Sequence, residues 1–149
     1  FRKKPIMKRI NEYKKLFSVE KEIDLKQLKT TYRNLVKEWH PDKFQKGDEK
    51  AIEAELMSRQ IIDGYHFLVS IAPETKAANL EDYNETINSP IMDWQHKGLV
   101  LEMTFLDGNT YEFFGVNKAL YIKICQSDKL TRFAKRNVFN SFIYRKIKN

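Results

Sequence analysis

The segment that organises this chain reads Tyr32-Arg33-Asn34-Leu35-Val36-Lys37-Glu38-Trp39-His40-Pro41-Asp42-Lys43. Its first part predicts an amphipathic helix, and that helix has to stop at His40 because a proline disfavours the helical conformation for the residue before it. A polar loop with a glycine at position 47 follows Asp42. The segment therefore presents an imidazole, a rigid proline ring and a carboxylate together at an exposed corner.

Two stripes of side chains run along the predicted helix, which we place at 25–39 with Asp24 as its N-cap. The apolar stripe recurs at helical spacing and should face another helix. Its members are Leu25, Leu28, Tyr32, Leu35, Val36 and Trp39. The second stripe is basic and consists of Lys26, Lys29, Arg33 and Lys37. A stripe of like charges is in most proteins only solvated surface, so it indicates a site only together with the corner at its end.

Further helices are predicted on both sides of this one. A short helix precedes it over 10–17, a long helix follows over 50–70, and a fourth spans 73–87. The long helix should pack antiparallel against the central one. Its outer face is acidic, with Glu49, Glu53, Glu55 and Asp63. Gly64 in its middle predicts a close helix contact, because glycine costs a helix about 1 kcal/mol relative to alanine. Residues 1–9 are expected to form a mobile, solvated basic arm.

The helix and its His-Pro-Asp corner together resemble the J-domain of DnaJ and its relatives. The resemblance covers about residues 10–86, and Ile61 and Tyr65 match the Ile-x-x-x-Tyr pattern near the end of that family's third helix. Three positions depart from the pattern, namely Asn34, Glu38 and Ser58. The first two are commonly basic in the family, which leaves open whether docking is weakened or redirected. The third is often aromatic, which predicts different local packing there.

The resemblance implies a co-chaperone and not an enzyme. In J-domains the basic face of the second helix docks on the acidic surface of a DnaK-type ATPase chaperone, and the corner engages the nucleotide-binding domain near its interdomain linker. The chaperone-binding residues carried over to this sequence are His40, Pro41, Asp42, Lys26, Lys29, Arg33 and Lys37. Asp42 would accept an arginine of the chaperone. The chaperone hydrolyses ATP, so this chain is expected to need no cofactor, and an unfolded protein is the expected client.

The hydrophobic period changes in the second half of the chain. Asn88-Ser89-Pro90 breaks the helical pattern, and from Leu99 apolar residues alternate with others as in a strand. Asp107-Gly108 predicts a hairpin turn between two strands, and Asn117 predicts the cap of a following helix. The predicted strands and helices lie over 99–105, 110–116, 118–126, 129–136 and 141–147.

These patterns predict an α+β protein of two domains. The first is an all-α J-domain helical hairpin over 10–87, and a linker follows over 88–96. The second, over 97–149, is a small α+β unit made of a β-hairpin, a helix and a returning strand.

The second unit resembles the KTSC domain over about residues 97–148. That module is named for its occurrence at the C-terminus of some lysyl-tRNA synthetases. The matching features are Tyr111-Glu112-Phe113-Phe114-x-Val116, Ala119-Leu120-Tyr121, Ser127, and Phe139-Asn140 to Tyr144-Arg145. The resemblance implies no defined activity. In a co-chaperone, this module would select the client or the location.

The same unit supports an alternative function, the binding of RNA or another nucleic acid. Its basic residues are interleaved with Phe133, Phe139, Phe142 and Tyr144, and basic side chains beside aromatic rings suit a single strand, whose bases stack and whose phosphates pair. The basic residues are Lys129, Arg132, Lys135, Arg136, Arg145, Lys146 and Lys148. A basic surface over an aromatic core and a site for a protein partner are the other interpretations.

Composition excludes several classes of protein. The chain has 149 residues, is 42% hydrophobic and carries a net charge of +7, with two basic blocks flanking an acidic one, which suits acidic partners. His40 and Asp42 lack a Ser or Cys nucleophile in motif context and a Gly-rich phosphate loop, so no catalytic residues are expected. No apolar run approaches the roughly 18 residues of a membrane span. With no recognisable signal peptide either, we expect a cytoplasmic protein with no membrane partner.

The remaining reactive side chains predict no further site. A single cysteine and three histidines exclude an internal disulfide and make a metal site improbable. Cys125 is expected to be partly buried, and His66 and His96 are expected to be ordinary surface or packed histidines.

Overall fold

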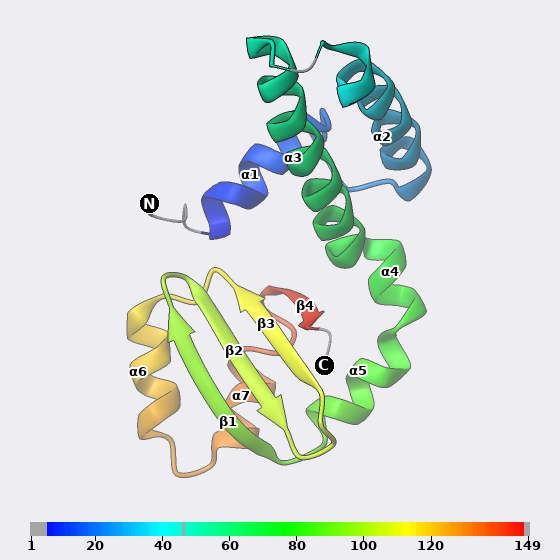
Figure 1. Ribbon diagram of the computed structural model, residues 1–149. Helices are drawn as coiled ribbons and strands as arrows, with labels where there is room; N and C mark the ends of the chain where they lie inside the picture. The colour runs from blue at the N-terminus through cyan, green and yellow to red at the C-terminus, as the bar shows by residue number, and fades with distance from the viewer. Residues whose placement is uncertain (1–5, 46, 148–149) are drawn as a thin grey trace. The chain divides into compact units, whose positions relative to one another are not determined.

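The computed structural model describes residues 6–45 and 47–147, and the chain divides into two compact units. One unit comprises Arg9–Lys76 and the other contains Ala77–Asn149. The protein is α+β, with helices in the first unit and an antiparallel sheet in the second (Figure 1).

The first unit consists of helices. They are α1 (Ile6–Leu16), α2 (Leu25–Trp39), a 3₁₀ turn η1 (Pro41–Lys43), α3 (Glu49–Ile71) and α4 (Pro73–Ala78). Helix α1 begins at Ile6, so the arm expected over 1–9 is helical from that residue, while residues 1–5 lie outside the described part of the chain. The carboxylate of Asp24 accepts the Lys26 N–H at 3.0 Å, which confirms it as the N-cap of α2.

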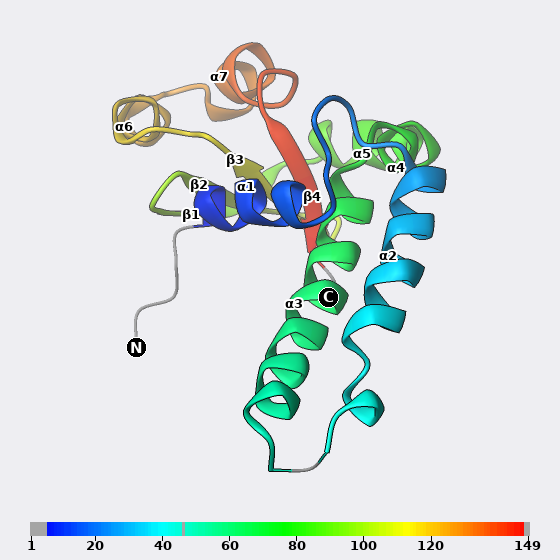
Figure 2. The same cartoon turned by 90° about the horizontal axis from the view of Figure 1, so that it is seen from above.

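Helices α2 and α3 form the predicted antiparallel hairpin and lie side by side in both views (Figures 1 and 2). Leu28 of α2 is buried, and α3 buries Ala54, Ile61 and Leu68. The rings of Tyr32 and Tyr65 stack with centroids 4.1 Å apart. Glu74 of α4 accepts the Leu25 N–H at 3.1 Å, so α4 is tied back to the start of α2.

The close helix contact predicted at Gly64 is made with α1. A Cβ atom at this position would lie 2.9 Å from Tyr13 Cδ1 and 3.2 Å from Phe17 Cε2. Both aromatic side chains are buried, so neither ring has free space to move into. Glycine at position 64 therefore lets α1 pack directly on the backbone of α3.

Gly64→Ala is expected to destabilise the helical unit. Overpacking a buried site costs about 1–3 kcal/mol, which exceeds the ~1 kcal/mol that alanine gains in helix propensity. Native-state hydrogen exchange of the α2 and α3 amides should show the loss as faster exchange. Asp63→Ala, at the exposed neighbouring position, should change the free energy of opening by less than about 0.5 kcal/mol. Slower exchange in Gly64→Ala than in the wild type would contradict the steric argument.

The second unit is a four-stranded antiparallel sheet with helices packed on it. Its elements are α5 (Leu80–Ile87), β1 (Ile91–Lys97), β2 (Val100–Phe105), β3 (Thr110–Phe114), α6 (Lys118–Gln126), α7 (Leu130–Asn137) and β4 (Ile143–Ile147). The strand order is β1-β2-β3-β4. Gly108 has a φ of 91°, as the predicted hairpin turn requires. Asn117 Oδ1 accepts the Leu120 N–H at 2.8 Å, so Asn117 caps α6 as predicted.

Two elements of this unit differ from the prediction. The stretch 88–96, expected as a linker, contains most of β1, which pairs with β2 along its length. The helix expected over 73–87 is divided at Asn79 into α4 and α5. Strand β1 lies at the sheet edge, carries a register shift between Ile91 and Asp93, and is only partly buried. The alternation of apolar and polar residues that marks a half-buried strand is therefore weak there.

The core of the second unit lies between the sheet and its helices, with α6 and α7 on the same side of the sheet (Figure 2). Strand β2 contributes Leu101, Met103 and Phe105, which are fully or almost fully buried. The other buried members are Tyr83, Ile87, Tyr111, Phe113, Val116, Ile124, Ala134, Val138 and Phe139. Because Tyr83 and Ile87 belong to α5, that helix is part of this core.

Candidate functional site

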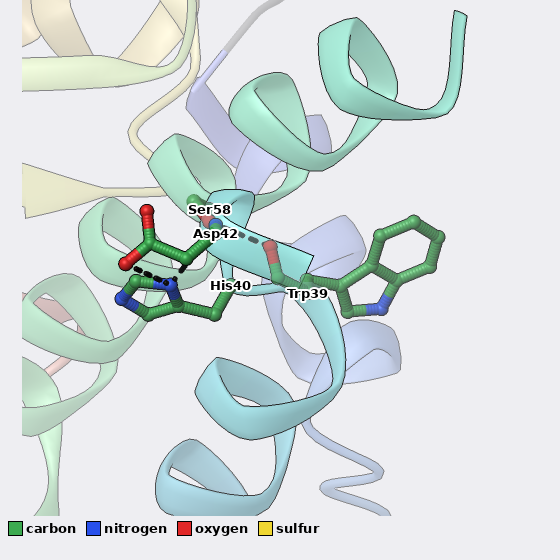
Figure 3. Close-up of polar contacts among 4 residues, drawn as sticks. All are labelled: Trp39, His40, Asp42 and Ser58. Carbon is green, nitrogen blue, oxygen red and sulfur yellow. Dashed lines mark hydrogen bonds and ion pairs between the residues drawn. The ribbon is translucent and has the colours of Figure 1, made fainter. Parts of the chain in front are cut away.

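The corner after α2 is a tight turn that contains His40 and Asp42 (Figure 3). His40 leaves the helical conformation with φ −60° and ψ 127°, as the proline after it demands. Its Nδ1 atom accepts the Asp42 N–H at 3.2 Å, and its carbonyl accepts the Lys43 N–H at 3.0 Å. The Phe44 N–H donates to the Pro41 carbonyl at 3.1 Å, which closes the turn.

The side chains of this corner face solvent. His40 is 50% exposed and Asp42 is 92% exposed, and Asp42 Oδ2 lies 3.5 Å from His40 Nδ1. Pro41 is exposed as well. An exposed carboxylate beside an imidazole can receive a cation from a partner, because neither group is already committed to the interior of the protein.

A serine of α3 bonds to the end of α2 next to the corner. Ser58 Oγ donates to the Trp39 carbonyl at 3.1 Å (Figure 3). Trp39 and Ser58 are both half-buried. Ser58, which departs from the J-domain pattern, therefore makes a polar contact between α3 and the end of α2.

The basic stripe of α2 leads up to the corner. Lys26, Lys29, Arg33 and Lys37 are all exposed. Among residues 6–45 and 47–147, none of the four has a carboxylate within ion-pair distance. Asn34 and Glu38, which depart from the family pattern, are exposed as well. The stripe thus remains open to an acidic partner.

The basic candidates of the second unit separate into two groups. Lys129, Arg132, Lys135 and Arg136 lie on α7 or next to its start and are exposed, and Lys135 Nζ donates to Asn88 Oδ1 at 2.8 Å. Arg145 and Lys146 lie on β4 instead. Arg145 Nε is 3.6 Å from Glu112 Oε1 across the sheet, and burial raises the pKa of Glu112 although this guanidinium lowers it. Lys148 lies outside the described residues.

The aromatic residues among these basic ones point into the core. Phe139 is fully buried, and Phe133, Phe142 and Tyr144 are half-buried against the core of the unit. Tyr144 also stacks on Tyr83 with ring centroids 3.8 Å apart. The aromatic rings named in the sequence therefore support the sheet, and the exposed face of α7 is basic without them.

The comparisons with known proteins concern the second unit. Residues 89–142 match the KTSC domain family. The match begins before the predicted resemblance did, because it includes β1, and it extends through α7. No curated protein matches the chain. The KTSC match covers β1, β2, β3, α6 and α7 and ends before β4, so it stops short of the predicted end at residue 148. No J-domain family matches the helices of the first unit.

The isolated reactive residues form no second site. Cys125, on a helix within the KTSC match, is exposed, and the prediction that it is partly buried is wrong, because the buried face of α6 is that of Ile124. His96 Nε2 lies 2.7 Å from the Val116 carbonyl and its ring stacks on Tyr121, whereas His66 is exposed on α3. In the described part of the chain, no three His, Cys, Asp or Glu side chains gather as a metal site would require. Within residues 6–45 and 47–147, every helix is too short or too polar to cross a bilayer.

Proposed function

We propose that this chain is a J-domain co-chaperone that binds a DnaK-type chaperone and stimulates its ATP hydrolysis. The observation that carries the proposal is the exposed corner of His40, Pro41 and Asp42 at the end of a helix with an open basic face. Exposed carboxylates are common on protein surfaces, but this one lies next to an imidazole at the end of a helix whose basic face has no ion pair in the described part of the chain. This exposed corner and the basic face beside it are accessible to a partner protein.

The two parts of this surface have different tasks. The basic face of α2 brings the chain to an acidic surface and orients it, because long-range charge complementarity speeds encounter. Asp42 then pairs with an arginine of the chaperone, a charge-assisted contact. Binding favours the chaperone state that is competent for hydrolysis, so the effect is a coupling free energy between two sites. The KTSC-like unit selects the client, an unfolded protein, or the place of action.

Single-turnover ATP hydrolysis tests the proposal. A DnaK-type chaperone loaded with ATP is followed with and without the full chain. We expect a faster hydrolysis rate that saturates as the chain concentration rises. An unchanged rate with a chaperone that other J-domain proteins stimulate would refute the proposal.

Neutralising the basic face should weaken docking in a salt-dependent way. Lys29→Gln together with Arg33→Gln should lower the apparent affinity about tenfold at low salt, because electrostatic steering contributes factors of about 10 to 1,000 to association rates. The difference from the wild type should shrink as salt rises, since the screening length is about 10 Å at 0.1 M. The half-saturating chain concentration in the hydrolysis assay measures this.

A matched control removes two charges elsewhere on the same unit. Lys15 and Lys21 are exposed and lie off the basic stripe. Lys15→Gln with Lys21→Gln should leave the half-saturating concentration close to that of the wild type. If both double variants lose affinity equally, net charge and not the α2 face governs the encounter.

The second candidate function is binding of RNA or another nucleic acid through α7. The exposed positions of Arg132, Lys135 and Arg136 on one helix favour it. The aromatic rings weaken the argument from base stacking, because Phe139 is buried and the other three are half-buried against the core. The basic side chains of α7 would then contact phosphate groups, and binding would weaken steeply as the salt concentration rises. Titration of a short RNA at several salt concentrations tests this function independently of any chaperone.

A further inference from the structure

At the end of α2, the Trp39 carbonyl has no backbone donor in the described part of the chain. The last carbonyls of a helix normally lack intrahelical donors and need other partners. Here the shortage is greater, because Pro41 has no N–H to offer. The next three N–H groups are all used inside the turn: that of Asp42 by His40 Nδ1, that of Lys43 by the His40 carbonyl, and that of Phe44 by the Pro41 carbonyl. None of them donates to the Trp39 carbonyl.

Ser58 supplies the missing donor. Its hydroxyl reaches the Trp39 carbonyl at 3.1 Å from a position nineteen residues further along the chain. Both residues are half-buried, where an unpaired carbonyl costs more than it does in open water. An aromatic hydrocarbon ring at position 58, as the J-domain pattern often has, could fill space but could not donate this bond.

The bond acts on the site because of where it is attached. The Trp39 carbonyl oxygen lies in the same rigid peptide plane as the His40 nitrogen. Holding that oxygen from α3 fixes the plane from which the His40 side chain and the turn with Asp42 project (Figure 3). Without the bond, the corner would retain its three internal hydrogen bonds but would lose this link to α3.

We propose that Ser58 is a positioning residue for the corner, which acts through the Trp39 carbonyl and does not touch the partner itself. Its effect on chaperone stimulation rests on the proposed function, whereas its effect on the corner does not. Ser58→Ala leaves the turn in place but lets it sample other orientations. Only the fraction of molecules with the correct orientation then binds, which raises the apparent dissociation constant.

The test compares Ser58→Ala with two other variants of α3. Ser58→Thr retains the hydroxyl. Ser70→Ala makes the same chemical change at a serine whose hydroxyl bonds to Phe67 of its own helix at 2.5 Å, away from the corner. We expect Ser58→Ala to raise the half-saturating concentration in single-turnover hydrolysis about two- to tenfold, as loss of one net hydrogen bond predicts. Ser58→Thr should recover most of the loss and Ser70→Ala should show none.

A second measurement needs no chaperone. The amide chemical shifts and hydrogen exchange of Asp42, Lys43 and Phe44 report the corner directly. They should change in Ser58→Ala and stay unchanged in Ser70→Ala. If these amides are the same in Ser58→Ala as in the wild type, or if Ser58→Thr is as impaired as Ser58→Ala, the positioning role is refuted. If the wild type fails to stimulate while the amides respond as expected, the co-chaperone function fails and the positioning role stands.

Discussion

Replacing His40 with Gln should abolish stimulation of the chaperone while leaving the helical unit folded. The imidazole is 50% exposed, and in the described part of the chain its polar contacts are with Asp42, within the turn itself. Loss of the cap that Nδ1 provides to the Asp42 N–H should cost about 0.5–2 kcal/mol, a local cost that should leave the packing of α2 on α3 in place. Single-turnover hydrolysis measures the activity, and hydrogen exchange of the α2 and α3 amides measures the fold.

Asp42→Asn should have a similar effect for a different reason. The substitution keeps the size and polarity of the side chain but removes the charge that an arginine of the chaperone would meet. A hydrogen bond to a charged group contributes about 1.5–3 kcal/mol, so the affinity should fall about ten- to a hundredfold. Since Asp42 is 92% exposed, no loss of stability is expected.

A neighbouring substitution provides the control for both variants. Gln45 is exposed and follows the turn, outside the His-Pro-Asp corner. Gln45→Ala should stimulate the chaperone as the wild type does. If His40→Gln also stimulates like the wild type, the corner is not the contact and the co-chaperone hypothesis is wrong.

Tyr83→Ala should have the largest effect on stability, and the effect should be confined to the second unit. Tyr83 is 2% exposed, stacks on Tyr144 and meets Tyr111 edge-on at 5.1 Å. Its hydroxyl donates to the Phe139 carbonyl at 2.6 Å. Removing a buried aromatic side chain costs about 3–5 kcal/mol. The prediction follows because Tyr83, on α5, belongs to the core of the second unit.

Native-state hydrogen exchange distinguishes the two units in one experiment. The amides of β2 and β3 should lose protection in Tyr83→Ala, whereas those of α2 and α3 should keep it, because they belong to the other unit. Tyr83→Phe retains the ring and removes only the hydroxyl, so it should cost about 1–3 kcal/mol from the unpaired carbonyl. Unchanged protection in β2 and β3 would mean that α5 is dispensable for this unit.

Local signals in the sequence predicted most of the helices and the hairpin. Pro41 ends α2 at Trp39, and Asp24 and Asn117 cap their helices. The turn at Asp107-Gly108 joins β2 to β3. Each of these devices works within about four residues, through steric restriction or through one side chain bonding to a nearby N–H. The residues concerned are adjacent in the chain, so the sequence displays them directly.

The features that were missed depend on residues far apart in the chain. Strand β1 is stabilised by pairing with β2, although its own pattern is weak. Helix α5 joins the second unit because Thr86, fully buried, donates to Asp107 Oδ2 at 2.6 Å and accepts from Asn109 Nδ2 at 2.9 Å. No pattern among neighbouring residues in the sequence predicts these contacts.

The corner itself combines both kinds of information. Proline acts on its immediate neighbour, so the order of residues alone places the helix end at Trp39, with an imidazole and a carboxylate beside the bend. The packed structure was needed to show that Ser58 bonds to the Trp39 carbonyl and that the lysines of α2 have no ion pairs in the described part of the chain. Those outcomes depend on which side chains meet when α2 packs on α3, and packing brings together residues whose spacing along the chain carries no signal.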